Sequence, residues 1–468
     1  MIKPPEIVVP SEDPFENDEL SRKETIEKLT SFLEHLSEPF VLGLNSPWGT
    51  GKTTFVRLWD QHLKNSGFNT LNFNAWETDF SEDPFLALVE ELRAEISTLM
   101  EDDPSRGKDI SKKLKKSSIA IAKKGVPIAL RVLTSGLLNI DEKSEDQISE
   151  LVSEIAKERV DEYSRRKNSI GGFKKTLKDL VSVLSKGEGS EKPLVIFIDE
   201  LDRCRPPYAI SLLEHAKHLF SVPGIVFVIS VDRTQLSNSI CAVYGERFDA
   251  DGYLRRFIDL DFVLPDPPGK DFVHHLFETM GIFDLLDQRN HHKADQEKKE
   301  LYDLLNLILP PLGLSLRTQI HIFSRIKIVM MTTQEGHRIF SKELALLTVL
   351  REWNQPLFEE FISGTVDPKE IIDVLENASG GSIFLNRPGW FLEGYILAMG
   401  AEVGRISPLI QTYKNRTKDG SADQFHSREK RAVDVYNQIR KMEETGTFLR
   451  ATASRIAFSD RFLNHRNS

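Results

Sequence analysis

The sequence contains only two cysteines among its 468 residues, Cys204 and Cys241, and they lie far apart without any C-x-x-C pair. This scarcity excludes a disulfide framework and a cysteine-based zinc site, and it suits a protein of the reducing cytosol. The chain also lacks a basic start followed by an apolar stretch. We therefore expect no secretion signal and a cytoplasmic location.

An excess of positive charge is missing as well. The net charge of −10 argues against a general nucleic-acid binder, because such proteins are normally basic, although it leaves room for a local basic patch. With 40% hydrophobic and 28% charged residues, the composition is that of a soluble globular protein. A chain of 468 residues is long enough for two or three compact units.

A long uninterrupted apolar run is also absent. The best candidate, residues 118–140, is interrupted by Lys123, Lys124, Pro127 and Arg131. A membrane helix needs about 20 consecutive apolar residues, so we expect no integral membrane association but a helical insertion packed on a larger core. A basic amphipathic surface for anionic lipid or nucleic acid is the alternative, because "KDISKKLKKSS" comes just before this segment.

One glycine is missing from an otherwise complete phosphate-binding pattern. The pattern G-x-x-x-x-G-K-[ST] begins with glycine, whereas the segment "SPWGTGKTT" begins with Ser46. Gly51, Lys52 and Thr53 complete the pattern, and Gly49 leaves a second point where the backbone can approach a ligand closely. Serine is small enough for the turn to form, but a positive φ at Ser46 would cost more than at glycine.

The flanking sequence has the order that this pattern requires. An apolar run at residues 38–44 predicts a buried parallel strand, and residues 53–63 place apolar side chains along one helical face. Loop N–H groups at the helix N-terminus would then face phosphate oxygens. Lys52 would reach the β- and γ-phosphates, and the Thr53 hydroxyl would hold Mg²⁺. The candidate nucleotide-binding residues are Ser46, Pro47, Trp48, Gly49, Thr50, Gly51, Lys52, Thr53 and Thr54.

A second motif supplies carboxylates. The segment "PLVIFIDELDRC" is an apolar strand that ends in Asp199 and Glu200. The carboxyl edge of a parallel sheet is where such folds place ligand chemistry. Asp199 would accept a hydrogen bond from a Mg²⁺-bound water or bind the ion through outer-sphere contacts, and Glu200 would be the general base or the group that orients water for hydrolysis.

Three further segments predict strands, at residues 69–76, 224–232 and 257–264. Helical patterns separate them, and this alternation predicts an α/β fold with a mostly parallel sheet that helices cover on both faces. No N-K-x-D motif, which reads guanine, occurs in the chain. ATP is therefore favoured over GTP as the nucleotide.

The segments "SPWGTGKTTF", "FNAW", "VIFIDELDRC", "VFVISVD" and "YLRRFIDLDFVLP" together resemble the KAP family of P-loop NTPases, over roughly residues 14–350. The family's usual loop, G-x-W-G-S-G-K-[ST], has glycine where this chain has Ser46, and its usual D-D-L-D-R-C block has aspartate in place of Glu200. The resemblance implies a Mg²⁺-dependent ATPase core of the additional-strand type. In such a core, one strand lies between the loop strand and the strand that carries Asp199.

The resemblance also implies an arginine that completes the site. The family's Y-L-[EK]-K-I stretch corresponds to residues 253–257, which puts Arg256 at the basic position and makes Arg255 a departure. A helical lid would instead supply Arg317, for which a plain surface arginine is the alternative. The candidate catalytic residues are therefore Glu200, Lys52, Arg256 and Arg317, with Thr53 and Asp199 as metal ligands.

We expect an ATPase core at residues 1–270 with an insertion at about 81–190, a helical lid at 271–350 and a helical interaction region at 351–468. The resemblance implies ATP hydrolysis that drives conformational change or assembly in a bacterial anti-phage defence complex, with protein partners from the same operon and self-association. A slowly hydrolysing nucleotide-gated scaffold is one alternative, and an ATPase that senses nucleic acid or a membrane surface is another. The Asp199–Glu200 pair favours hydrolysis, and the acidic charge disfavours nucleic acid.

Overall fold

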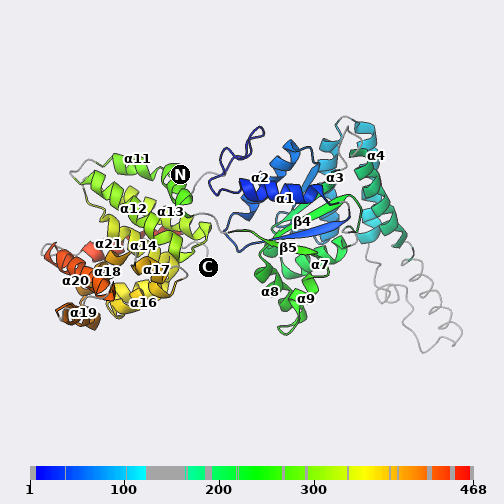
Figure 1. The fold of residues 1–468 in the computed structure, drawn as a ribbon. Coiled ribbons are helices and arrows are strands. Elements are labelled where there is room, and N and C mark those ends of the chain that lie inside the picture. The colour runs from blue at the N-terminus through cyan, green and yellow to red at the C-terminus, as the bar shows by residue number, and fades with distance from the viewer. Residues whose placement is uncertain are drawn as a thin grey trace, which may run out of the picture. The chain divides into compact units, whose positions relative to one another are not determined.

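The computed structural model describes residues 7–36, 38–101, 103–122, 164, 167–184, 192–217, 219, 221–265, 269–289, 293–334, 337–378, 381–386, 389–418, 424–442 and 448–463. The chain divides into two compact units (Figure 1). The first is formed mainly by Arg22–Pro265, and the second mainly by Asp266–Ser468. Each unit has its own core and is described by itself.

A five-stranded parallel sheet organises the first unit. Its strands are β1 (Phe40–Asn45), β2 (Thr70–Asn74), β3 (Leu194–Asp199), β4 (Ile225–Val231) and β5 (Leu260–Val263). They lie in the order β2-β3-β4-β1-β5, and every neighbouring pair is parallel. β3 and β4 are buried along their whole length, which explains their nearly continuous apolar sequences. All five predicted strands are confirmed, and β4 is the additional strand between β1 and β3.

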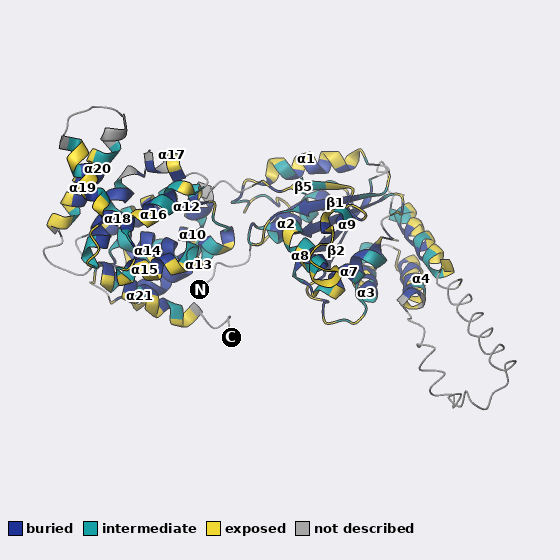
Figure 2. Cartoon of the chain, turned by 90° about the horizontal axis from the view of Figure 1, so that it is seen from below, coloured by how far each residue is buried: buried dark blue, intermediate teal, exposed yellow. Residues whose placement is uncertain are grey.

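Helices cover both faces of the sheet and make a three-layer core. Alternate strand residues point to opposite faces, so Leu42 and Val228 pack on one side while Ile196 and Phe227 pack on the other. The first side carries α1 (Lys23–Glu34) and α2 (Lys52–Asn65). The second carries α3 (Pro84–Leu99), α4 (Pro104–Ala122), α7 (Pro206–Ala216), α8 (Arg233–Tyr244) and α9 (Ala250–Leu254). In Figure 2 the central strands are buried, while the outward face of α1 is exposed.

The predicted helical insertion is present between β2 and β3. Its described parts are α3, α4 and the helical residues 167–184. Residues 167–184 bury Phe173, Leu177 and Leu180 in the core on the second face of the sheet. Residues 123–163, with most of the candidate membrane segment, lie outside the described residues. Within the part of the chain that is described, no helix is both long and apolar enough to cross a membrane.

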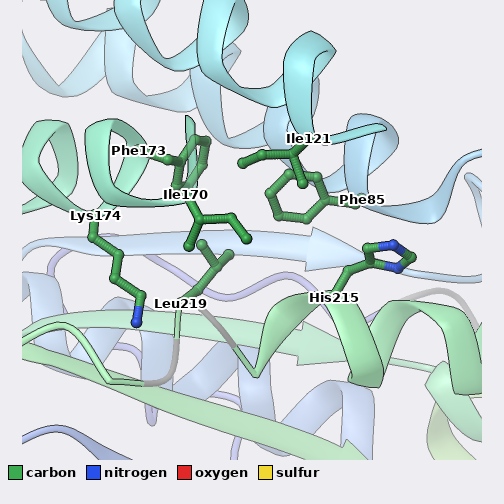
Figure 3. A pocket seen from close by; sticks show the side chains of 7 residues that line it. All are labelled: Phe85, Ile121, Ile170, Phe173, Lys174, His215 and Leu219. Carbon is green, nitrogen blue, oxygen red and sulfur yellow. The ribbon is translucent and has the colours of Figure 1, made fainter. Parts of the chain in front are cut away.

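The insertion closes against α7 through apolar side chains. Figure 3 shows Phe85 of α3, Ile121 of α4 and Phe173 converging on Leu219, around a small pocket beside His215. Phe85 and Phe173 have their ring centroids 5.5 Å apart. The insertion is therefore part of the core of the first unit, and the pocket is an ordinary packing gap.

The second unit is entirely helical in its described residues. Its helices are α10 (Gly269–Thr279), α11 (Ile282–Asp287), α12 (Ala294–Leu312), α13 (Leu316–Thr332), α14 (Ser341–Trp353), α15 (Gln355–Ser363), α16 (Pro368–Asn377), α17 (Gly381–Asn386), α18 (Trp390–Glu402), α19 (Pro408–Lys418), α20 (Gln424–Met442) and α21 (Phe448–Leu463). One hydrophobic core runs through them, from Phe272 to Ile456. The helical C-terminal region expected from the sequence is thus confirmed.

Candidate nucleotide-binding site

The loop between β1 and α2 has the backbone shape of a phosphate-binding loop. Gly49 and Gly51 take positive φ values of 81° and 88°, a conformation that favours glycine. Gly51 directly precedes the first residue of α2, Lys52, so the loop N–H groups gather at a helix N-terminus. Thr53 and Thr54 follow in the first turn, half-buried. The structure therefore brings the predicted loop residues together as the pattern requires.

Ser46 fits the loop better than the missing glycine suggests. Its φ is not positive, so it carries none of the cost considered from the sequence. Its side chain is 2% exposed and lies 2.6 Å from the Thr50 hydroxyl, which in turn donates to the Pro47 carbonyl at 2.8 Å. Serine thus adds a hydrogen-bonded chain across the loop at a position where glycine would add none.

Lys52 is held inside its own loop. Its ammonium donates to the Ser46 carbonyl at 2.6 Å and to the Pro47 carbonyl at 3.3 Å, and it lies 3.8 Å from a carboxylate oxygen of Asp202. Burial lowers the pKa of Lys52, and the nearby negative charge of Asp202 opposes that shift. The cation therefore already points across the loop, toward the place where phosphate oxygens would lie in a loop of this shape.

The second motif meets the loop at the carboxyl edge of the sheet. The Thr53 hydroxyl donates to Glu200 at 3.3 Å, and Glu200 also pairs with Arg203 at 2.5 Å. Asp199, the last residue of β3, is 8% exposed and accepts the Glu200 N–H at 2.9 Å. Glu200 has a φ of 61°, which is uncommon for a non-glycine residue and is found at functional sites.

The oxygen atoms at this edge suit a hard cation. Thr53 and Asp199 supply a hydroxyl and a carboxylate, and Mg²⁺ prefers few protein ligands of this kind together with water and phosphate oxygens. Among the described residues, no group of three or more His, Cys, Asp or Glu side chains forms a metal cage. The residues present therefore fit a cation that arrives with a nucleotide.

Cys204 lies close to this site without taking part in its chemistry. Its thiol is buried and contacts the Glu200 carbonyl, with 3.6 Å between sulfur and oxygen. Burial raises the pKa of the Cys204 thiol to about 12. Almost no thiolate exists at neutral pH, which excludes a cysteine nucleophile here.

Two carboxylates, those of Asp202 and Asp232, accept hydrogen bonds from Trp48 of the loop. Asp202 accepts the Trp48 indole N–H at 2.6 Å and the Asp232 backbone N–H at 2.7 Å. Asp232 follows β4, caps α8 through the Gln235 N–H and accepts the backbone N–H of Trp48 at 3.1 Å. Asp232 was not among the site residues predicted from the sequence, although it ends the "VFVISVD" segment at the same sheet edge as Asp199.

Among the described residues, Arg256 makes no contact with the loop of its own chain. It is exposed and follows α9, with its guanidinium 5.9 Å from the Tyr253 ring centroid. The segment then joins the beginning of β1, where the Asp259 N–H donates to the Val41 carbonyl at 3.0 Å. The loop follows the other end of β1, and a strand of six residues is roughly 20 Å long.

The two downstream arginines differ in their surroundings. Arg317 is exposed in the first turn of α13, in the second compact unit. Arg325, eight residues further along the same helix, is buried and forms ion pairs with Glu352 of α14 and Asp460 of α21. Arg325 is thus committed to the core of the second unit, whereas the Arg317 side chain is free to meet solvent.

Comparisons with solved structures give only distant similarity. The Orc1 protein of Aeropyrum pernix in complex with DNA is 14% identical, with a TM-score of 0.29, and the alignment covers 94% of this chain and 83% of that one. Drosophila ORC bound to poly(dA/dT) DNA and Cdc6 is 11% identical, with a TM-score of 0.32, and the alignment covers 95% of this chain and 62% of that one. No curated protein matches the chain.

The family comparison is decisive. The model of the KAP family P-loop domain matches residues 22–333, which is more than half of the chain. The match contains the loop at Ser46 to Thr54, the Asp199–Glu200 strand end, Arg256 and Arg317. With the parallel sheet and the loop geometry in agreement, the chain belongs to the KAP family of P-loop proteins.

Proposed function

We propose that the protein binds ATP with Mg²⁺ at the loop between β1 and α2 and hydrolyses it to ADP and phosphate. The observation that carries this proposal is the meeting of Thr53 and Glu200, 3.3 Å apart, beside the buried Lys52. A phosphate loop alone would support binding only. A carboxylate placed next to the loop's own hydroxyl adds a group that can act on water.

Each residue has a distinct task in the proposed reaction. Lys52 neutralises charge on the β- and γ-phosphates, and the loop N–H groups orient them. Thr53 and Asp199 would hold the Mg²⁺, which would neutralise phosphate charge. Glu200 accepts a hydrogen bond from the attacking water, aligns it with the γ-phosphate and takes its proton. The absence of an N-K-x-D motif supports adenine over guanine.

We further propose that Arg256 acts on the nucleotide of a neighbouring chain. Among the described residues Arg256 makes no contact with the loop of its own chain, and its segment joins the beginning of β1, whereas the loop follows the other end. Its exposure leaves it available to a second copy. Arg317, exposed on α13, is the alternative source of an arginine within the same chain.

The wider role follows from the family resemblance. The family includes phage-exclusion proteins, and this supports a hydrolysis cycle that drives conformational change or assembly in a bacterial anti-phage defence complex. Protein partners encoded in the same operon would then respond to the nucleotide state. A slowly hydrolysing scaffold would use the same site with binding in place of turnover as the signal.

A phosphate-release assay tests the proposed activity. The full chain is incubated with ATP or GTP, with Mg²⁺ or with excess chelator, and released phosphate is measured against time. We expect release from ATP with Mg²⁺, much less from GTP and none beyond background in chelator. Release that is unaffected by the chelator would contradict the metal assignment, and release from GTP equal to that from ATP would contradict the adenine preference.

A further inference from the structure

Asp202 forms a closed ring of contacts with Trp48 and Asp232. One oxygen of Asp202, Oδ2, accepts both the Trp48 indole N–H at 2.6 Å and the Asp232 backbone N–H at 2.7 Å. The ring closes because the Trp48 backbone N–H donates to Asp232 Oδ2 at 3.1 Å. Three elements far apart in the sequence are joined: the nucleotide loop, the turn after β3 and the end of β4.

Burying the Asp202 carboxylate at this position costs free energy of folding. Asp202 is only 4% exposed, and among the described residues its second oxygen, Oδ1, has no hydrogen-bond partner. The nearest cation is Lys52, whose ammonium is 3.8 Å from Oδ2. A buried carboxylate that is only partly satisfied destabilises a fold compared with an apolar residue of similar size. If the turn after β3 had only a structural role, an apolar residue in place of Asp202 would serve it better.

We propose that Asp202 is a positioning residue, which clamps Trp48 and the end of β4 so that the loop keeps its phosphate-binding shape before any ligand arrives. The proposal rests on nucleotide binding at this loop, as proposed above. A loop that is already ordered loses less conformational freedom when a ligand binds, so its affinity is higher. Asp202 Oδ2 is engaged twice and screened from solvent, which leaves the activation of water to Glu200.

Trp48 is the residue through which this clamp can be tested. Its side chain remains 39% exposed, while its N–H is fixed by Asp202. Trp48→Phe keeps an aromatic ring and removes only the donor, so it opens the clamp without removing a buried charge. Trp76→Phe is the matched control, because Trp76 is 51% exposed and no contact of its indole N–H with the described residues was found.

Calorimetric titration of the full chain with ADP measures the effect. We expect Trp48→Phe to weaken ADP binding about tenfold or more, the loss typical of one hydrogen bond to a charged group. Asp202→Ala should weaken it at least as much, and the double variant no further than Asp202→Ala alone, because both changes open one clamp. Trp76→Phe should bind as the parent does. Trp48→Phe should unfold at a somewhat lower urea concentration, because Asp202 loses a hydrogen bond, but circular dichroism should show it folded under the conditions of the titration.

A spectroscopic signature tests the contact without nucleotide. The chain has five tryptophans, so labelling with 5-fluorotryptophan gives five ¹⁹F resonances, and Trp48→Phe identifies the one from Trp48. Asp202→Asn retains an acceptor but removes the charge, so the Trp48 resonance should shift while the other four stay in place. An unmoved Trp48 resonance would overturn the contact on which the proposal depends.

The results of these titrations distinguish a failure of the positioning role of Asp202 from a failure of the proposed nucleotide site. If Trp48→Phe binds ADP like the parent while Lys52→Ala does not, the loop binds nucleotide and the positioning role of Asp202 is wrong. If Lys52→Ala also binds like the parent, the proposed site itself is wrong. If the losses of ADP affinity in Trp48→Phe and Asp202→Ala multiply in the double variant, the two residues act independently, and the proposal of one shared clamp is wrong.

Discussion

The Thr53 hydroxyl donates a hydrogen bond to Glu200 at 3.3 Å, across 147 residues of sequence. Thr53 belongs to the first turn of α2 and Glu200 follows β3, so the contact joins the two motifs that the sequence presents separately. The sheet order makes this possible, because β1 and β3 are both next to β4 and all three end at the same edge.

Glu200→Gln should retain ATP binding and slow hydrolysis about 10²–10⁴-fold, since an amide keeps the shape but does not accept a proton. Steady-state phosphate release and calorimetry together check both halves of this prediction. Glu214→Gln is the matched control, because Glu214 lies on α7 and contacts Tyr253 instead of the loop. Turnover of Glu200→Gln equal to that of the parent would show that another group activates water.

Ser46→Gly, which restores the usual residue of the pattern, should make the protein less stable. It removes the buried contact with Thr50 and adds the freedom of glycine to the unfolded chain, at a combined cost of about 1–2 kcal/mol. Urea unfolding measures the loss. Thr50→Val should also destabilise the protein, and the double variant should cost less than the two single losses added together, because both changes remove the same contact. A more stable Ser46→Gly variant would mean that serine only substitutes for glycine.

Specific activity should rise with protein concentration if Arg256 serves a neighbouring chain. Arg256→Ala should abolish this rise and leave ATP binding intact, because among the described residues Arg256 makes no contact with the loop of its own chain. An arginine of this type contributes about 10³–10⁵ in rate. Arg255→Ala is the control, since Arg255 is also exposed and adjacent. If the specific activity does not depend on protein concentration, and light scattering gives a monomer mass in saturating ATP, Arg256 does not act on a neighbouring chain. Arg317 would then be the remaining candidate for the catalytic arginine.

The sequence predicts the centre of the sheet well because β1, β3 and β4 are short, mostly apolar runs. The runs that become β3 and β4 are buried throughout, so their composition alone indicates central strands. The place of β4 between β1 and β3 is not visible in composition or spacing, and it came from the family resemblance. Strand order depends on long-range pairing, which a local pattern does not encode.

The site was predicted in part, for similar reasons. Lys52, Thr53, Asp199 and Glu200 belong to contiguous motifs, and the structure brings them to one edge. Asp232 carries no motif of its own, and its contact with Trp48 spans 184 residues. The φ of Ser46 likewise depends on the packing of the whole loop. Residues that act through tertiary contacts are therefore the ones that the sequence conceals.

Lys52→Ala tests the central claim, that this loop binds nucleotide, most directly. The substitution removes the only side-chain cation of the loop and leaves its glycines in place, so the backbone turn should persist. Calorimetric titration with ATP and Mg²⁺ compares the variant with the parent, and circular dichroism confirms that both are folded. We predict that the parent binds ATP and that Lys52→Ala shows no measurable binding. Equal ATP affinity in the two proteins would contradict the account.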